Sequence, residues 1–497
     1  MTTTESARVR LPNVDSDTNA LINGLLDVLE KRRRRNWLRS CYYDGKHAVR
    51  NFGSGIVPEQ YFNLGLVLGW SAKAVDILAR RCNLDGYTWS GELESLGYQE
   101  VWDDNFFGAE SSSAVISSLI HGPAFLINTT GDEDLDEPES LIHVAEAMNA
   151  TGEMNGRTRR LDNLLSVLKR DEDRNVLSLA LYLDGRTLTA NRERVNRRWS
   201  VDWSEHPWGV PAEAVIYKPR TGRPFGSSRI SRVVMSLNDR GVRALIRMEG
   251  HSDIFSYPEL WMLGADPYEV LVDADGKPLP TWKAMMGRIK GIPDDQDATD
   301  EKLARADIKQ FQQSSPAPHI ELFQQCANDF AGETDLPVSA LGVQAKTNTT
   351  TADGSDNAEK QLIAEAEGAT DDWSPAFRRT MIRALAIKND LNTIPADWAS
   401  IDTKWRPPAY LSRSAVADAG LKQLSAVPWL AETEVGLELL GLSDSQIKRA
   451  MADKRRAQAA TLVDKLTTPP APTPPPPADA IDQAVADQVA LNGAVAN

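Results

Sequence analysis

Cysteine is scarce in this sequence. Cys41, Cys82 and Cys326 are the only three in 497 residues, and no two of them are close together. This pattern excludes a disulfide framework and a CxxC metal knuckle, and it fits a reducing compartment. Long apolar runs are missing as well: the residues after Met1 lack the apolar core of a signal peptide, and no run of about eighteen apolar residues occurs. We therefore expect a soluble protein that is neither secreted nor embedded in a membrane.

Positive charge is also in short supply. The chain has 70 acidic and 55 basic residues, which gives a formal net charge of −15. A protein that grips nucleic acid over a broad surface needs the opposite sign, because its cationic side chains replace the counterions of the phosphates. The composition therefore excludes broad binding of nucleic acid and leaves only local or weak contacts with DNA.

The common motifs of catalysis and metal binding are absent. The six histidines are scattered, without an HExxH motif or a paired ligand spacing, and GxSxG does not occur. Gly222 and Gly226 are too close together for a phosphate-binding loop, no Gly-Lys pair follows them, and Pro224 removes a backbone donor. The run from Asp273 to Gly276 lacks the later glutamate of an EF-hand. We expect no enzymatic activity, no metal site and no cofactor.

The remaining composition is that of a globular protein, with 41% hydrophobic and 25% charged residues. A chain of 497 residues exceeds the size of one hydrophobic core, so two or more structural units are expected. Apolar residues at helical spacing predict a first helix over 16–42. The basic run from Lys31 to Arg35 lies within it, and because consecutive residues spread around a helix it predicts a collar, solvated or facing another subunit.

The next segments indicate an α+β fold. Shorter helices are predicted at 73–82, 96–105 and 111–121. From 124 to 219, β-like runs such as AFLIN, LSLALYL and AVIYKP alternate with turn signals at Asn155-Gly156 and Asp184-Gly185.

A long helix is predicted from about Ser227 to Phe255, and it would be about 40 Å long at 1.5 Å per residue. It carries an apolar stripe of Ile230, Val234, Leu237, Leu245 and Met248. A second stripe consists of Arg229, Arg240, Arg243 and Arg247. Two interpretations of the arginines stay open: a solvated face with local ion pairs to Asp239 and Glu249, or an interface with acidic side chains of neighbouring subunits.

The second half of the chain is predicted to contain a small mixed segment, 261–318, with a short helix around 282–290. A second helix follows from His319, with Phe323 and Phe330 on its apolar face. Residues 342–357 have no large apolar side chain beyond Val343 and predict an exposed loop. A helix then starts near a capping box at Asp356 and Glu359, is interrupted by Pro375 and continues past Ile387, and a last helical region spans 412–466. Beyond it, a proline-rich run predicts an extended tail.

Taken in order, these segments resemble the portal proteins of tailed bacteriophages. The phrases YYDGKH, NLGLVLGWSAKAVDILARR and LDGYTW resemble the N-terminal wing of that family. PFGSSRIS with the long helix after it resembles the first stem helix, and HIELFQQCANDFAGETDLPVSALG resembles the second. No single phrase is as specific as a metal-ligand signature, so the ordered set carries the resemblance.

The resemblance implies a portal-type α+β architecture with a mainly helical wing, long stem helices, a small α/β clip insert and a helical crown. The implied domains are the wing over 1–225, first stem helix over 226–260, clip over 261–318, second stem helix over 319–341, tunnel loop over 342–357, wing helix and return over 358–411, crown over 412–466 and tail over 467–497.

The implied function is a homo-oligomeric ring of about twelve subunits at the capsid vertex, through which double-stranded DNA is packaged and ejected. The implied partners are the terminase large subunit, the major capsid and scaffold proteins and a head-completion adaptor, and the implied location is the virion, with host cytoplasm during assembly. The alternatives are a nuclease of a phage or mobile element and a minor head protein that forms no ring.

Two groups of residues are predicted to act in such a ring. The DNA-channel residues of the tunnel loop are Lys346, Thr347, Asn348, Thr349 and Thr350. The stem or subunit-interface residues are Arg229, Arg240, Arg243, Arg247, Phe323 and Phe330.

Overall fold

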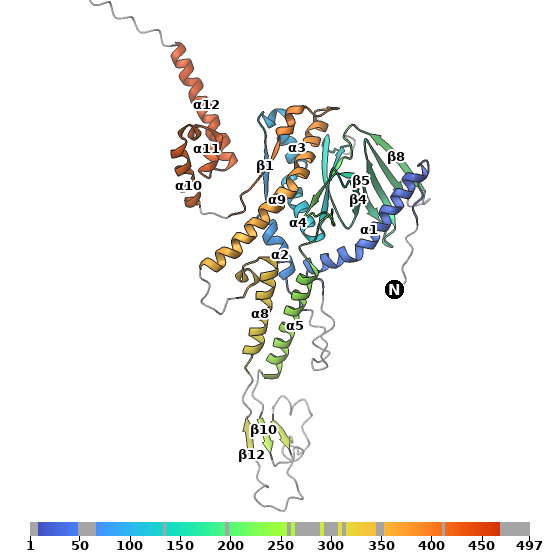
Figure 1. Cartoon of the computed structure of the whole chain (residues 1–497), viewed down its shortest axis with the longest axis vertical. Coiled ribbons are helices and arrows are strands. Elements are labelled where there is room, and N and C mark those ends of the chain that lie inside the picture. Colours follow the sequence, from blue (N-terminus) through green and yellow to red (C-terminus); the bar gives the residue numbers. More distant parts are fainter. Residues whose placement is uncertain are drawn as a thin grey trace, which may run out of the picture. The chain divides into compact units, whose positions relative to one another are not determined.

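The computed structural model describes residues 8–47, 66–132, 136–193, 198–255, 260–263, 289–292, 307–310, 315–343, 352–409 and 413–467. The chain divides into two compact units, Met1–Ala409 and Tyr410–Asn497. Both helices and strands are abundant, as the α+β prediction requires (Figure 1).

Four helices precede the main sheets. α1 begins because the Asp15 carboxylate accepts a hydrogen bond of 2.8 Å from the backbone N–H of Thr18, which satisfies one of the free donors of the first turn. All four predicted helices are confirmed to within a few residues. They are α1 (Ser16–Tyr43), α2 (Trp70–Ala79), α3 (Tyr98–Asp104) and α4 (Phe107–His121), with β1 (Leu84–Thr88) and η2 (Leu93–Leu96) between α2 and α3.

The region from Pro123 to Ile216 is built of strands in two antiparallel sheets. One sheet has the order β3-β2-β9 and the other β4-β5-β6-β7-β8. The predicted turn at Asp184-Gly185 joins β6 to β7, where Leu183 pairs with Arg186. The strands are β2 (Pro123–Thr130), β3 (Ser140–Glu146), β4 (Ala150–Met154), β5 (Leu161–Arg170), β6 (Val176–Leu183), β7 (Arg186–Arg192), β8 (Trp199–Glu205) and β9 (Ala212–Ile216). The prediction of a mainly helical wing over 1–225 is therefore wrong for residues 123–216, where alternating apolar residues favour strands.

Alternation along β2 explains why the two sheets stack. Ala124 and Leu126 point to one face and join the core that includes α4 and α9 (Ala352–Lys388). Phe125 and Ile127 point to the other face and pack against residues of the five-stranded sheet. The far face of that sheet packs on α1 and on the segment before it, through Val9, Leu11, Ile22, Leu25, Leu179 and Leu181. Helices, two sheets and α1 thus form successive layers (Figure 1).

Two further helices, α5 (Arg232–Phe255) and α8 (Ala317–Thr334), lie side by side and form an antiparallel hairpin (Figure 1). The described residues between them form a three-stranded sheet in which β10 is parallel to β11 and antiparallel to β12. These strands are β10 (Leu260–Leu263), β11 (Ile289–Ile292) and β12 (Asp307–Gln310). Residues 289–290 of the predicted short helix thus belong to a strand, and 282–288 lie outside the described residues.

α9 differs from its prediction at both the start and the middle. It begins at Ala352, so residues 352–357 are helical and not part of a loop, and the capping box at 356–359 does not mark its start. Pro375 lies inside an unbroken helix, because Trp373 and Phe377 on either side of it are fully buried and their packing outweighs the lost hydrogen bond. η4 (Val338–Leu341) precedes this helix.

The first unit ends with η5 (Ala396–Ser400) and β13 (Asp402–Trp405), which pairs antiparallel with β1. The described part of the second unit is helical, as predicted for 412–466. Its elements are α10 (Arg413–Ala426), η6 (Pro428–Glu432), α11 (Glu434–Leu439) and α12 (Asp444–Thr467). The predicted proline-rich tail lies outside the described residues from 468 on.

Candidate functional site: the joint between the hairpin and the body

The hairpin of α5 and α8 is attached to the body of the first unit by aromatic packing and by ion pairs. The Trp70 ring of α2 lies 5.3 Å from the Phe323 ring and 5.4 Å from the Phe330 ring, centroid to centroid. Within the hairpin, Arg240 of α5 contacts Asp329 of α8 at 2.6 Å. Both side chains of this pair are partly exposed, so its contribution to stability is small.

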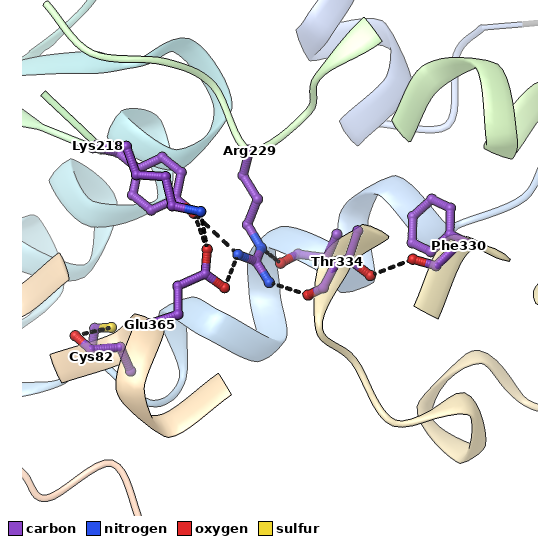
Figure 2. A network of polar contacts seen from close by, with 9 residues as sticks. Cys82, Lys218, Arg229, Phe330, Thr334 and Glu365 are labelled. Atoms are coloured by element: carbon purple, nitrogen blue, oxygen red, sulfur yellow. Dashed lines mark hydrogen bonds and ion pairs between the residues drawn. The ribbon is translucent and has the colours of Figure 1, made fainter. Parts of the chain in front are cut away.

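Arg229 is the central residue of the joint. It stands before α5, because the Ser231 hydroxyl accepts a hydrogen bond from the backbone N–H of Val234 and caps the helix start at Arg232. Its guanidinium donates to the backbone oxygen of Ala74 at 2.5 Å and to that of Thr334 at 2.7 Å. One side chain thus connects α2, the end of α8 and the start of α5 (Figure 2).

Glu365 of α9 neutralises this arginine. The two side chains are only 5% and 9% exposed and form an ion pair. Glu365 also accepts hydrogen bonds from the Tyr217 hydroxyl and from Lys218 Nζ, the latter at 2.6 Å (Figure 2). Burial alone would raise the pKa of Glu365, but the Arg229 charge and the hydrogen bonds hold that pKa below its ordinary value of 4.5. The carboxylate is therefore ionised at neutral pH.

A second buried network fixes the other half of α9. Glu213 of β9 accepts from Arg379 at 2.7 Å and from Arg383 at 2.8 Å. Arg383 also donates to the amide oxygen of Asn128 in β2 at 3.0 Å, and Asn128 donates back to the Thr380 carbonyl. These contacts attach α9 to the sheet β3-β2-β9, and Glu365 attaches α9 to the hairpin.

The structure corrects two of the predicted interface residues. Arg229 is not on the long helix and its side chain is held inside the chain, so it does not belong to the surface stripe. Phe330 is 0% exposed and belongs to the core of its own subunit, because α2 covers it. Phe323 is partly buried against the same tryptophan.

The remaining stem arginines lie on α5, as predicted. Arg240 pairs with Asp329 of the neighbouring helix and not with Asp239, whose carboxylate accepts from the Tyr42 hydroxyl at 2.9 Å. Arg243 is half-buried and Arg247 is exposed. The predicted apolar stripe is confirmed at Ile230, Val234 and Leu237, which belong to or pack against the main core. Further along α5, Val242 and Ile246 are buried in place of Leu245 and Met248. The predicted channel residues 346–350 lie outside the described residues.

Glu365 is the site residue that the sequence analysis missed. The signal was available, because Leu362, Ala366 and Ala369 are buried and recur at helical spacing, and Glu365 falls on the same face. A carboxylate on an apolar helix face needs a buried partner. Which arginine would supply it could not be read from the sequence, since Arg229 is more than a hundred residues away in the chain.

The described residues contain no group of three or more His, Cys, Asp or Glu side chains placed to hold a metal ion. Among the described helices, none combines the length and the hydropathy that a membrane crossing needs. The three cysteines are buried as free thiols.

Comparison with known proteins finds relatives among phage portal proteins. The chain is 24% identical over 393 residues to the portal protein of Mycobacterium phage L5, covering 77% of each chain. It is 24% identical over 408 residues to the portal protein of Mycobacterium phage D29, covering 80% of each. A chain from the neck of an empty GTA (gene transfer agent) particle is 12% identical, with a TM-score of 0.40, and the match covers 79% of this chain and 96% of that one.

A family model supplies the assignment. Residues 24–460 match the family described as phage portal protein, SPP1 Gp6-like. The match includes α5, α8, α9 and the joint between them. Since it extends over most of the sequence, this chain belongs to the phage portal protein family.

Proposed function

We propose that about twelve copies of this chain assemble into a closed ring at one vertex of a phage capsid, through which double-stranded DNA is packaged and ejected. The observation that carries the proposal is the family match over residues 24–460, which includes the whole hairpin. The negative net charge supports it, since a channel in which DNA slides should not hold many phosphates. The ring works in the virion and is assembled in the host cytoplasm, with terminase, capsid and scaffold proteins and later a head-completion adaptor.

The ring itself is tested by native mass measurement and negative-stain imaging of the purified protein over a wide range of concentrations. We expect closed rings of one or two discrete masses. Monomers alone, even with capsid and scaffold proteins present, would show that the chain is a head protein that forms no ring. Cleavage of duplex DNA that depends on a divalent metal would show that the protein is a nuclease, which is the alternative function.

Within the ring, we assign the contact with DNA to the segment between Val343 and Ala352. Its sequence is small and polar, and Lys346 is its only cation. The central residues are Lys346, Thr347, Asn348, Thr349 and Thr350. Both ends of the segment are held: Leu341 is buried beside α8, and α9 is anchored through Glu365.

The DNA contact is tested in assembled heads. Because one lysine per subunit gives only a thin belt of charge, Lys346→Ala should weaken the contact with DNA modestly. Shortening the segment by several residues should lower the amount of genome packaged or retained per head, while the mass of the ring stays the same. Deletion of residues 468–497 is the matched control and should change neither quantity. Normal packaging without the segment would exclude its role in the channel.

The subunit contact of the stem is assigned to Arg243 and Arg247. Neither side chain forms an ion pair with another described residue, and Arg247 is exposed. An acidic chain supplies carboxylates on the neighbouring copy, and a heterologous ring contact joins two different faces of the same subunit.

A further inference from the structure

A cavity of about 370 Å³ opens at the inner side of α1. Four arginines line it, Arg32, Arg35 and Arg39 of α1 and Arg223 of the loop 222–227, and we name it the arginine pocket. The described residues that line it include no aspartate and no glutamate. Two members of the basic collar, Arg32 and Arg35, therefore meet the glycine-containing loop at one place.

The fold forces these arginines together. Arg32, Arg35 and Arg39 are three, four and seven residues apart, so they share one face of a helix. The loop is fixed beside them because Gly226 has a φ of +68° and passes so close to Tyr217 that a Cβ would lie 2.2 Å from its carbonyl oxygen.

The cluster is electrostatically unfavourable within one chain. Burial, together with the charges of Arg35 and Arg223, lowers the pKa of Arg39 to about 10. Arg39 donates a hydrogen bond of 2.8 Å to the backbone oxygen of His121. This carbonyl group carries no net charge, so it does not neutralise the guanidinium. None of the four guanidiniums forms an ion pair within the described residues, although the chain has more acidic than basic residues.

Two residues that line the pocket each have a buried polar atom without a hydrogen-bond partner. Asn36 is 3% exposed and donates its amide to the Ala147 carbonyl, which orients its oxygen, and that oxygen has no hydrogen-bond partner. The Nδ1 atom of His121, 5% exposed, also lacks a partner. Both atoms are shielded from solvent, so the arginine side chains decide which ligand the pocket binds. A carboxylate pairs with a guanidinium through two parallel hydrogen bonds, and a chain of net charge −15 supplies many carboxylates.

We propose that the arginine pocket receives a carboxylate-bearing segment of a second copy of this chain and is one half of a subunit contact. The inference rests on the proposed ring. Its support is the complementarity between a cationic cavity and a chain of net charge −15, together with the need of a ring for two different matching surfaces on each subunit. Arg35 and Arg223 are exposed and provide attraction, while Arg39 lies deeper and receives the carboxylate.

The test compares Arg35→Glu with Arg34→Glu. Both arginines are exposed on α1 and both variants change the net charge equally, but only Arg35 lines the pocket. Thermal unfolding of the monomer should be the same for both. The concentration at which half of the subunits are in rings should rise by about tenfold or more for Arg35→Glu and little for Arg34→Glu, because a repulsive charge then faces the incoming carboxylate.

A covalent readout identifies the partner. In Arg35→Lys, a carbodiimide joins the new amine to a carboxylate in contact, with loss of water, and rings mixed from ¹⁴N- and ¹⁵N-labelled subunits show whether the joined peptides come from two copies. A link between copies supports the inference. A link only within one copy overturns it.

The remaining outcomes are separable. If wild-type subunits form no ring, the proposed function fails first. If rings form equally well from both glutamate variants, the pocket inference alone fails. If ring formation is unchanged but Arg35→Glu weakens binding of a short DNA duplex, measured by fluorescence anisotropy, the ligand is nucleic acid and the inference is wrong.

Discussion

The joint and the arginine pocket both contain arginines, but the arginine of the joint is paired with a carboxylate and those of the pocket are not. At the joint, Arg229 is buried against Glu365, and the pair is completed by Tyr217 and Lys218. In the pocket, four guanidiniums face one cavity without a carboxylate among the described lining residues. A charge that is paired inside the chain supports the fold, whereas a cluster that the fold leaves unpaired is available to another molecule. Three experiments on the isolated subunit test this contrast.

The largest effect is expected for Glu365→Gln. The substitution leaves the Arg229 charge buried without a counterion, so the free energy of unfolding should fall by about 3–5 kcal/mol. Urea denaturation of the monomer measures it. The matched control is Glu359→Gln on the same helix, whose partner is Arg81 and whose side chain is 45% exposed; this pair should contribute about 1 kcal/mol or less. Equal losses for the two variants would contradict the structural role of the joint.

The pH dependence of the same pair gives a smaller effect. Because the pKa of folded Glu365 lies below its ordinary value of 4.5, its stabilising contribution is present above that value and is lost as pH falls through the folded pKa. Unfolding free energies of wild type and Glu365→Gln should therefore converge as the pH falls below 4.5. A difference that stays constant over this range would show that the carboxylate charge contributes nothing.

The smallest effect is expected in the pocket. Arg35→Gln removes one of four like charges and no ion pair, so the stability of the monomer should change by no more than about 0.5 kcal/mol, in the direction of greater stability. Thermal and urea unfolding of the monomer measure it. A loss of 2 kcal/mol or more, on the order of a buried pair, would show that Arg35 has a partner within the chain and that the contrast with Arg229 is false.

Much of the local structure could be predicted from the sequence. The first helix, the strands at AFLIN, LSLALYL and AVIYKP and the turn at Asp184-Gly185 follow from apolar period and turn chemistry, and the structure confirms them. The errors lie where packing or capping overrides these signals. Pro375 does not break α9 because its buried aromatic neighbours hold the helix, and Arg229 leaves the helical stripe because Ser231 caps the helix two residues later.

The family, the class of the fold and the long helices of the hairpin could be read from the sequence alone, since these depend on the order of elements and on periods within each element. Which charges meet is visible only in the folded structure. Arg229 and Glu365, or Arg39 and Arg223, are far apart in the chain, and no local pattern records their distance. Whether an arginine is a buried support or part of an open binding site depends on burial and on a partner across the fold, because both set the cost of its charge.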